Sequence, residues 1–427
     1  MSKLKVLCIP FGPALSHVFH CLSVADALKK QGHQVVFATG KERCQFIKDT
    51  GYVVYPIAAV KKAEVEKAMG MNWYTKELVD QCVGDELHVI NEYKPNVIIN
   101  SFCPTPNISA RIAKVPNVGI ISSPFLKGIL ARSNRSEKEV FAEIMDGETI
   151  LQKIGNVIKI KVLKTLLKTF NKKWTKPFNI VLEKYGLPKT ESMFDLYLGD
   201  LNLVEGIPDF CPIENLPPSA YYVGCLEWGG LEKEIPDWLK ELDHHYPVIY
   251  VTLGTRVKNK KKIYQKIIYA FQDAKYQVII SMGGGAETLQ DLVPYPSHIR
   301  IEQFVPGPTM INASDIVIHH GGYGTVMETL RRGIPNLCIP FSPEQATAAQ
   351  AIHNAECGLR LTPHVPFQFG FRNFTIEDLQ KSVKEILNNP KYKQNAGGLQ
   401  KNINQYSSEK KIVRYIEEFV EGWGNKN

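Results

Sequence analysis

A short group of glycines and a threonine in the second half of the chain could hold a phosphate. Gly321, Gly322 and Gly324 precede Thr325, and they follow an apolar, β-branched run that ends in a histidine pair. Such a run is typical of a buried strand that enters a tight turn. A helix after the turn would offer unpaired amide donors and about half a unit of positive charge, and glycines let a phosphate approach the backbone. The pattern indicates a diphosphate site; the alternative is a tight turn beside a packed His320.

Two strand–loop–helix units in a row must position these residues. We expect Thr325 to cap the first helix and Gly333 to end it in the left-handed conformation. The second unit is a predicted strand over residues 335–341 and a predicted helix over residues 345–357, which Gly358 ends. Parallel strands end at one edge of their sheet, so both loops should lie where open α/β sheets bind ligands.

The stretch from Ser314 to Leu361 resembles the donor-sugar signature of the nucleotide-sugar glycosyltransferases, which include bacterial macrolide enzymes and plant and animal UDP-dependent enzymes. In that family a His-x-Gly-x-x-Ser/Thr-x-x-Glu run closes on the diphosphate and ribose, and an Asp/Glu-Gln pair follows the next strand. The matching positions here are His320, Gly322, Thr325, Glu328, Glu344 and Gln345.

This resemblance implies a role for each residue of the signature. The residues expected at the phosphates are His320, Gly324 and Thr325. Glu328 is expected to bind the ribose hydroxyls, and Glu344 with Gln345 the sugar. The chemistry agrees, because hydroxyl donors suit phosphate oxygens, while a carboxylate and an amide can bind vicinal hydroxyls.

Two further donor-binding segments follow from the same resemblance. Gly254 and Thr255 end a predicted strand in a loop that faces the phosphates. Phe304 and Val305 stand where the family has Trp-x-Pro-Gln, and the Phe304 ring can stack on a nucleobase. Gly307 occupies the glutamine position of that motif. It cannot supply the amide, so the choice between uracil and thymine stays open.

The first half of the chain resembles the acceptor half of the same transferases. Residues 3–57 alternate between strand-like and helix-like segments, which predicts a parallel sheet with right-handed crossovers. In the family the first loop ends in a Gly-His pair at the acceptor pocket, and here the pair is Ser16-His17. An imidazole with an ordinary pKa of about 6.5 can accept a hydroxyl proton at neutral pH. We therefore predict His17 as the catalytic base, with His20 as the alternative.

The strand that ends at Asn100 carries a second departure from the family. Relatives often place an aspartate after this strand, where it orients the catalytic histidine. Here Asn100 and Ser101 stand at these positions. Either could orient the ring by a hydrogen bond, but neither carries the charge.

Length and pattern together predict two domains. A chain of 427 residues exceeds one hydrophobic core. The resemblance implies an α/β fold of two Rossmann-like domains facing across a cleft (GT-B type). The parts that it implies are an acceptor-binding domain at 1–225, a linker at 226–246, a nucleotide-sugar domain at 247–405 and a terminal helix at 406–427 that crosses back to the first domain.

Composition narrows the class of protein. Nine scattered cysteines without a Cys-x-x-Cys pair indicate reduced thiols, and the absence of Asp-x-Asp predicts that no metal is required. The net charge of +8 favours anionic partners, but no nucleic-acid motif accompanies it. No signal-peptide core or membrane-spanning run is evident, so we expect a cytoplasmic protein. No cofactor is expected, and a UDP-sugar or dTDP-sugar would be the co-substrate.

A lysine-rich segment at 131–177 is the most individual part of the sequence. A basic amphipathic helix can lie on an anionic membrane surface, which predicts a weak membrane association. The alternative, which we favour, is a helix with solvated lysines whose apolar side faces the acceptor pocket. The lysines are Lys153, Lys159, Lys161, Lys164, Lys168, Lys172, Lys173 and Lys176.

The sequence therefore predicts an inverting hexosyltransferase that moves a sugar from a nucleoside diphosphate, with UDP favoured, to a hydroxyl of a small lipophilic acceptor such as a natural product. The alternatives are a nucleotide-sugar epimerase on the same fold, a glycolipid-forming transferase, and a non-catalytic partner of a transferase. The last is suggested by the absent aspartate and by Ser16.

Overall fold

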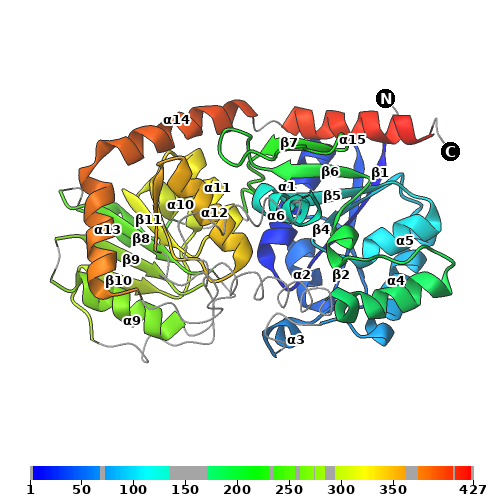
Figure 1. The fold of residues 1–427 in the computed structure, drawn as a ribbon, viewed down its shortest axis with the longest axis horizontal. Helices are drawn as coiled ribbons and strands as arrows, with labels where there is room; N and C mark the ends of the chain where they lie inside the picture. The colour runs from blue at the N-terminus through cyan, green and yellow to red at the C-terminus, as the bar shows by residue number, and fades with distance from the viewer. Residues whose placement is uncertain are drawn as a thin grey trace, which may run out of the picture.

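The described residues form two α/β domains, each built around one parallel sheet (Figure 1). The computed structural model describes residues 3–67, 73–134, 171–230, 235–243, 245–254, 260–273, 275–283, 294–361, 374–406 and 409–424. The two sheets lie side by side along the long axis, the first to the right and the second to the left in Figure 1. This is the α/β architecture that the sequence predicted.

The first sheet has seven strands in the order β3-β2-β1-β4-β5-β6-β7, and every pair is parallel. The order reverses between β1 and β4, which makes the carboxyl ends of these two strands a ligand-binding edge. The strands are β1 (Lys5–Pro10), β2 (Gln34–Thr39), β3 (Val53–Pro56), β4 (Val97–Ser101), β5 (Asn117–Ser122), β6 (Leu201–Glu205) and β7 (Ala220–Gly224).

Helices cover both faces of this sheet, as valine- and isoleucine-rich parallel strands require. The helices are α1 (Leu15–Lys30), α2 (Lys41–Asp49), α3 (Lys62–Lys67), α4 (Lys76–Tyr93), α5 (Thr105–Ala113) and α6 (Ser123–Asn134), with a 3-10 turn, η1, at Met193–Tyr197. Most of the lysine-rich segment lies outside the described residues, and with it the predicted membrane-binding face.

The second sheet has six parallel strands in the order β10-β9-β8-β11-β12-β13. The strands are β8 (Val248–Thr252), β9 (Gln277–Ser281), β10 (Ile299–Glu302), β11 (Ile316–His319), β12 (Asn336–Cys338) and β13 (Gly358–Arg360). The helices of this domain are α9 (Lys260–Phe271), α10 (Gly307–Asn312), α11 (Tyr323–Arg331), α12 (Pro343–Asn354), α13 (Ile376–Asn388) and α14 (Pro390–Tyr406).

Two details of the second domain differ from the sequence prediction. Helix α11 begins at Tyr323 with Gly322 at its N-cap and no side-chain cap, so Thr325 lies inside the first turn and was wrongly predicted as the cap. Gly358 does not end α12, which stops at Asn354, but opens β13 where the Asn336 backbone leaves no room for a Cβ atom. The prediction for Gly333 is confirmed by its φ of +63°.

The last helix, α15 (Glu409–Gly424), crosses back to the first domain as predicted. In Figure 1 it lies along the upper edge of that domain, beyond the end of α14. Ile412, Val413 and Ile416 are buried in the core formed by α1 and the first sheet. Lys30 Nζ lies 2.7 Å from Glu409 Oε1, which adds an exposed ion pair at the start of the helix.

The two sheets are separated by the chain between Gly224, which ends β7, and Val248, which begins β8. Leu226 is buried in the first core, and Trp228 packs beside it. The start of the proposed linker therefore belongs to the packing of the first domain. The division at residues 225 and 247 remains a prediction of where each domain folds by itself.

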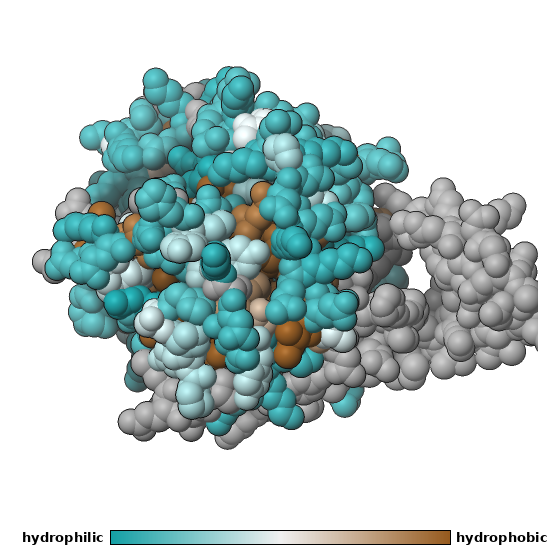
Figure 2. Space-filling view, turned by 90° about the vertical axis from the view of Figure 1, so that its left-hand side faces the viewer, coloured by the Kyte–Doolittle hydropathy of each residue, from teal (hydrophilic) through white to brown (hydrophobic). Residues whose placement is uncertain are grey.

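The outer end of the second domain carries mainly hydrophilic side chains, with hydrophobic residues visible in hollows between them (Figure 2). Such a surface is ordinary for a domain whose apolar side chains pack inward. Among the described residues, no helix is both long and apolar enough to cross a bilayer.

Candidate active site

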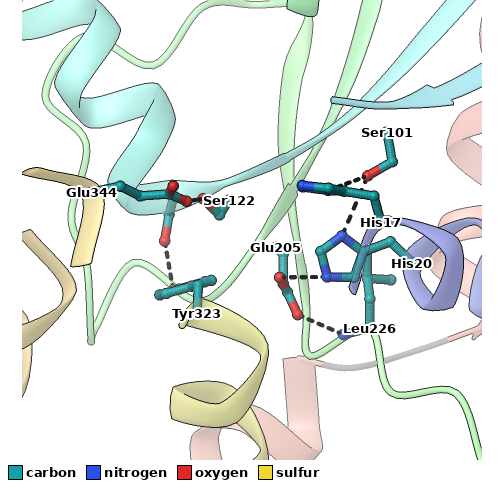
Figure 3. A network of polar contacts seen from close by, with 9 residues as sticks. His17, His20, Ser101, Ser122, Glu205, Leu226, Tyr323 and Glu344 are labelled. Carbon is teal, nitrogen blue, oxygen red and sulfur yellow. Dashed lines mark hydrogen bonds and ion pairs between the residues drawn. The ribbon is translucent and has the colours of Figure 1, made fainter. Parts of the chain in front are cut away.

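A chain of polar contacts links two histidines of α1 to the end of β4 (Figure 3). The Nδ1 atom of His17 lies 3.2 Å from Oγ of Ser101, and the same oxygen lies 3.4 Å from Nδ1 of His20. The pairing of β1 with β4 sets Pro10 opposite Ser101, which brings the loop after β1 to the end of β4. The first turns of α1 and the end of β4 thus meet at the edge where the strand order reverses.

Glu205 extends this chain, and sequence reasoning missed it. Oε2 of Glu205 lies 3.2 Å from Nε2 of His20, and the glutamate is only 1% exposed. Its Oε1 accepts a hydrogen bond from the Leu226 amide at 3.4 Å. Glu205 is the last residue of β6, so it stands at the same sheet edge as Ser101. An acidic residue that ends an apolar strand was the signal that could have found it.

The Glu205 carboxylate changes the acidity of His20. Burial lowers the pKa of this imidazole, but the charge of Glu205 and its hydrogen bond act in the opposite direction. Glu344 and Glu328 of the second domain add smaller contributions of the same sign. The net result is that the pKa of His20 is raised above its ordinary value.

Asn100 does not take part in the chain. Its Nδ2 donates a hydrogen bond to Oδ1 of Asn117 at 2.8 Å, and the side chain is fully buried. Adjacent residues of a strand point to opposite faces of the sheet, so Asn100 and Ser101 cannot both face α1. Of the two residues predicted to orient His17, the structure brings only Ser101 to it.

An aromatic wall surrounds the His17 imidazole. The ring of Phe102 stacks on it with centroids 4.8 Å apart and an interplanar angle of 4°, and Tyr197 stacks on the other face of Phe102 at 4.4 Å. Phe11 and Phe125 meet Phe102 edge-on. Phe102 has a φ of 54°, an uncommon left-handed backbone for an aromatic residue. The chain turns sharply after Ser101, and the predicted base thus lies against flat apolar surfaces.

In the second domain, the predicted phosphate residues pack around His320. A Cβ atom at Gly254 would lie 2.6 Å from Cε1 of His320, and one at Gly322 would lie 2.6 Å from its Nε2. Only glycine fits at either position without moving the ring. A Cβ atom at Gly324 would meet nothing within 4 Å. Thr255 lies outside the described residues, and Thr325 is partly buried in the first turn of α11.

The neighbouring His319 is a structural residue that our sequence interpretation overlooked. Its Nδ1 accepts a hydrogen bond from the Gly321 amide at 3.0 Å, and its Nε2 lies 2.8 Å from Oδ1 of Asn336. Burial lowers the pKa of His319 to about 4, so the ring is neutral at pH 7 and donates through Nε2. His319 thereby fixes the turn at Gly321, where φ is +85°.

The predicted ribose residue lies beside the predicted base-binding loop. A Cβ atom at Gly307 would lie 3.8 Å from Oε2 of Glu328. In that loop Phe304 is 54% exposed, whereas Val305 is buried and supports it from the core. Burial raises the pKa of Glu328 to about 7, the charge of Glu227 adds to the rise, and Arg332 opposes it.

The two residues of the predicted sugar site behave differently. Oε1 of Glu344 accepts a hydrogen bond from Oγ of Ser122 in the first domain at 3.0 Å. Oε1 of Gln345 accepts a hydrogen bond from the Phe341 amide within its own loop at 2.7 Å. This bond fixes the side chain and leaves its NH2 group as the donor for a ligand. A second link between the domains joins Tyr323 Oη to Ser123 Oγ at 2.6 Å (Figure 3).

The described residues contain no group of three or more His, Cys, Asp or Glu side chains that could hold a metal ion. The nine cysteines, all of them described, form no disulfide. The expectation that no metal is required stays a prediction.

Comparison with known proteins finds a family match in the second domain. Residues 266–419 match the family described as "Erythromycin biosynthesis protein CIII-like, C-terminal domain". This part of the chain is therefore similar to the C-terminal domain of that family. The match covers the second domain from α9 onward, including the glycine-rich turn, and it reaches into the helix that crosses back to the first domain.

Curated relatives resemble the chain along most of its length. It is 23% identical over 398 residues to a "PGL/p-HBAD biosynthesis glycosyltransferase" of Mycobacterium tuberculosis (strain ATCC 25177 / H37Ra), covering 92% of this chain and 87% of the relative. It is also 23% identical over 436 residues to "4'-demethylrebeccamycin synthase" of Lentzea aerocolonigenes, covering 96% and 97% of the two chains.

The fold of the chain is also found in solved structures. The structure of spinosyn rhamnosyltransferase SpnG complexed with thymidine diphosphate matches with a TM-score of 0.68 at 17% identity, covering 97% of this chain and all of that chain. Such a likeness concerns the fold, and it confirms the GT-B arrangement of two Rossmann-like domains.

Proposed function

We propose that this glycosyltransferase moves a hexose from a nucleoside diphosphate sugar to a hydroxyl of a small lipophilic acceptor, with inversion at the anomeric carbon. The observation that carries the proposal is the meeting of the two sheet edges. His17 stands at one edge, and Glu344, held by Ser122, stands at the other.

The reaction would proceed in one displacement. Nε2 of His17 takes the proton of the acceptor hydroxyl as its oxygen attacks the anomeric carbon. The bond between that carbon and the phosphate oxygen breaks, and its electron pair leaves with the nucleoside diphosphate. Attack from the side opposite the leaving group inverts the configuration. The start of α11, with the amides from Gly322 to Thr325, would stabilise the negative charge that develops on the diphosphate.

The donor is proposed to be a UDP-sugar or a dTDP-sugar. Glu328 would accept hydrogen bonds from the ribose, and the exposed ring of Phe304 would stack on the base. Gly307, one turn from these groups, supplies no side chain that would select between uracil and thymine. The relative SpnG is complexed with thymidine diphosphate, which keeps both bases in the proposal. No metal or cofactor is proposed beyond the donor.

The acceptor is proposed to be lipophilic and to present a flat apolar surface near its hydroxyl. The wall of Phe11, Phe102, Phe125 and Tyr197 beside His17 favours such a molecule over a free sugar. Two relatives, a PGL/p-HBAD biosynthesis glycosyltransferase and 4'-demethylrebeccamycin synthase, support a role in natural-product glycosylation. No nucleic acid takes part.

A panel of UDP- and dTDP-sugars with mixed hydroxyl acceptors tests the proposal. We expect release of nucleoside diphosphate together with an acceptor whose mass has increased by one hexose unit. The anomeric proton coupling of the product should show inversion. A new sugar nucleotide of unchanged mass, formed without acceptor, would instead identify an epimerase, and turnover of no donor at all would identify a non-catalytic partner.

A further inference from the structure

The structure supplies a carboxylate for His17 from an unexpected place. We infer that Glu205 sets the tautomer and basicity of His17 through His20 and Ser101, replacing the aspartate that related enzymes often carry beside the catalytic histidine. The inference rests on the proposed function for its effect on catalysis, but the hydrogen-bond chain can be measured without any substrate.

The direction of each hydrogen bond follows from the ionised carboxylate. Glu205 can only accept, so the ion-pair contact of 3.2 Å between its Oε2 and Nε2 of His20 favours a proton on that nitrogen. Nδ1 of a neutral His20 is then an acceptor, and the Ser101 hydroxyl donates to it across 3.4 Å. The Ser101 oxygen in turn accepts from Nδ1 of His17 at 3.2 Å. This places the basic lone pair of His17 on Nε2, where the acceptor hydroxyl would be deprotonated.

Protonation of His20 reverses the chain. When His20 carries protons on both nitrogens, its Nδ1 donates to Ser101, and the Ser101 hydroxyl is free to turn and donate to Nδ1 of His17. The proton of a neutral His17 then sits on Nε2, and the base is blocked. Because Glu205 favours the charged form of His20, the active arrangement is lost as the pH falls through a pKa that lies above the ordinary histidine value.

Other charged and titratable groups surround this pair and must be considered. Glu344 on α12 and Glu328 on α11 face His20 from the second domain and add negative potential. Tyr323 and Cys225 lie near Glu205, and burial keeps both neutral by raising their pKa values. Of these three glutamates, Glu205 is the one in direct contact with His20, since its Oε2 lies 3.2 Å from Nε2 of the imidazole.

Long-range proton–nitrogen NMR of the uniformly labelled protein tests the chain without substrate. We expect neutral His17 protonated on Nδ1 and neutral His20 protonated on Nε2. Glu205→Gln keeps the shape and a hydrogen-bond acceptor but removes the charge, so the pKa of His20 should fall. An unchanged pKa in this variant, or His17 protonated on Nε2 at high pH in the parent, would overturn the inference whether or not transfer has been found.

The pH profile of transfer is the second readout. In Glu205→Gln the acid limb of kcat should move to lower pH, and the plateau should fall about tenfold, because the carboxylate no longer stabilises the imidazolium of His17. The donor KM should stay within about twofold. Glu86→Gln is the matched control, since it removes another buried carboxylate of the same domain, held by Thr105 and Ser109 away from the histidines. Glu86→Gln should leave the pH dependence of kcat on the acid side unchanged.

Rescue separates positioning from structural support. Ser101→Asp puts a carboxylate directly beside His17, so the double variant Ser101→Asp/Glu205→Gln should recover most of the plateau lost in Glu205→Gln. If Glu205→Gln does not fold, Ser101→Ala cuts the same chain while leaving the Glu205–His20 pair, and it should lower the plateau to a similar extent. A Ser101→Ala variant with the parent plateau and acid limb would refute the inference. A parent that transfers no sugar would refute the proposed function instead.

Discussion

The Ser122 hydroxyl at the end of β5 donates a hydrogen bond to Oε1 of Glu344 at the start of α12, across 3.0 Å and from one domain to the other. Glu344 is the carboxylate that we assign to the sugar. Its orientation therefore depends on a contact that the first domain supplies.

Ser122→Ala should lower kcat/KM for the donor sugar by on the order of tenfold, since a hydrogen bond to a charged group is worth about 1.5–3 kcal/mol. Affinity for UDP alone should stay within about twofold, because Ser122 touches only the predicted sugar residue. Steady-state kinetics and calorimetry provide the two measurements. A loss of UDP affinity equal to the loss in kcat/KM would show that Glu344 does not belong to the sugar.

Glu328→Ala should weaken binding of both UDP and UDP-sugar by on the order of 1.5–3 kcal/mol through loss of the ribose contact. Burial raises the pKa of this carboxyl to about 7, so the ionised acceptor gains population between about pH 6 and pH 8. The difference in UDP affinity between parent and variant should therefore widen as the pH rises through this range. Calorimetry at three pH values checks it; equal UDP affinities throughout would refute the ribose assignment.

Gln345→Ala should leave UDP affinity nearly unchanged and depress turnover or sugar selectivity, because we assign its NH2 group to the sugar. The variant should also be less stable by about 1 kcal/mol, since the Phe341 amide loses its acceptor at 2.7 Å. Chemical denaturation and product analysis measure the two effects separately. If Gln345→Ala and Glu328→Ala lose UDP binding alike, the two loops are not divided as proposed.

Gly254→Ala should disturb the predicted phosphate site through His320. The residue has a φ of +64°, and the new Cβ atom would lie 2.6 Å from Cε1 of the imidazole. We expect a destabilisation of at least about 1 kcal/mol and weaker UDP binding. Gly229→Ala is a suitable control because its Cβ atom would meet nothing within 4 Å. Unchanged UDP affinity in Gly254→Ala would show that His320 does not contribute to phosphate binding.

His17→Ala should abolish transfer while preserving donor binding, because the imidazole takes the acceptor proton and does not contact the nucleotide. Ser101→Asp should raise the rate or shift its pH dependence upward, whereas Asn100→Asp should give no gain, since Asn100 is turned toward Asn117. Mass spectrometry of the glycosylated product measures transfer in each variant. Transfer that is retained in His17→Ala but lost in His20→Ala would identify His20, one helical turn further along α1, as the base. Transfer that is retained in both variants would exclude either histidine as the base.

The residues of the proposed donor half could be brought together from the sequence alone because they lie close together along the chain. His320, Gly322, Thr325 and Glu328 are placed by one turn and one helix, and Glu344 follows one strand later. Local spacing is enough to bring such residues to one edge. The error at Thr325 was also local, since a helix that starts from Gly322 needs no side-chain cap.

The other half depends on the arrangement of strands, which no local pattern fixes. Ser101 could be chosen over Asn100 only once the face of β4 toward α1 was known. Glu205 reaches His20 because β6 is added beside β5, far along the chain from α1. A single sequence gives no register between such distant strands, so the carboxylate partner of the histidines was missed.

The packing of α15 on α1 affects how the protein is made. Ile412, Val413 and Ile416 complete the core around the helix that carries His17 and His20. On the ribosome these residues are synthesised long after α1. Until then, the apolar surface that they cover in the first domain stays exposed to solvent. The whole second domain is made in the meantime. Acquisition of a finished acceptor site is therefore a late event in biogenesis, and nascent chains stalled before residue 409 should be preferred clients of chaperones that bind exposed apolar surface.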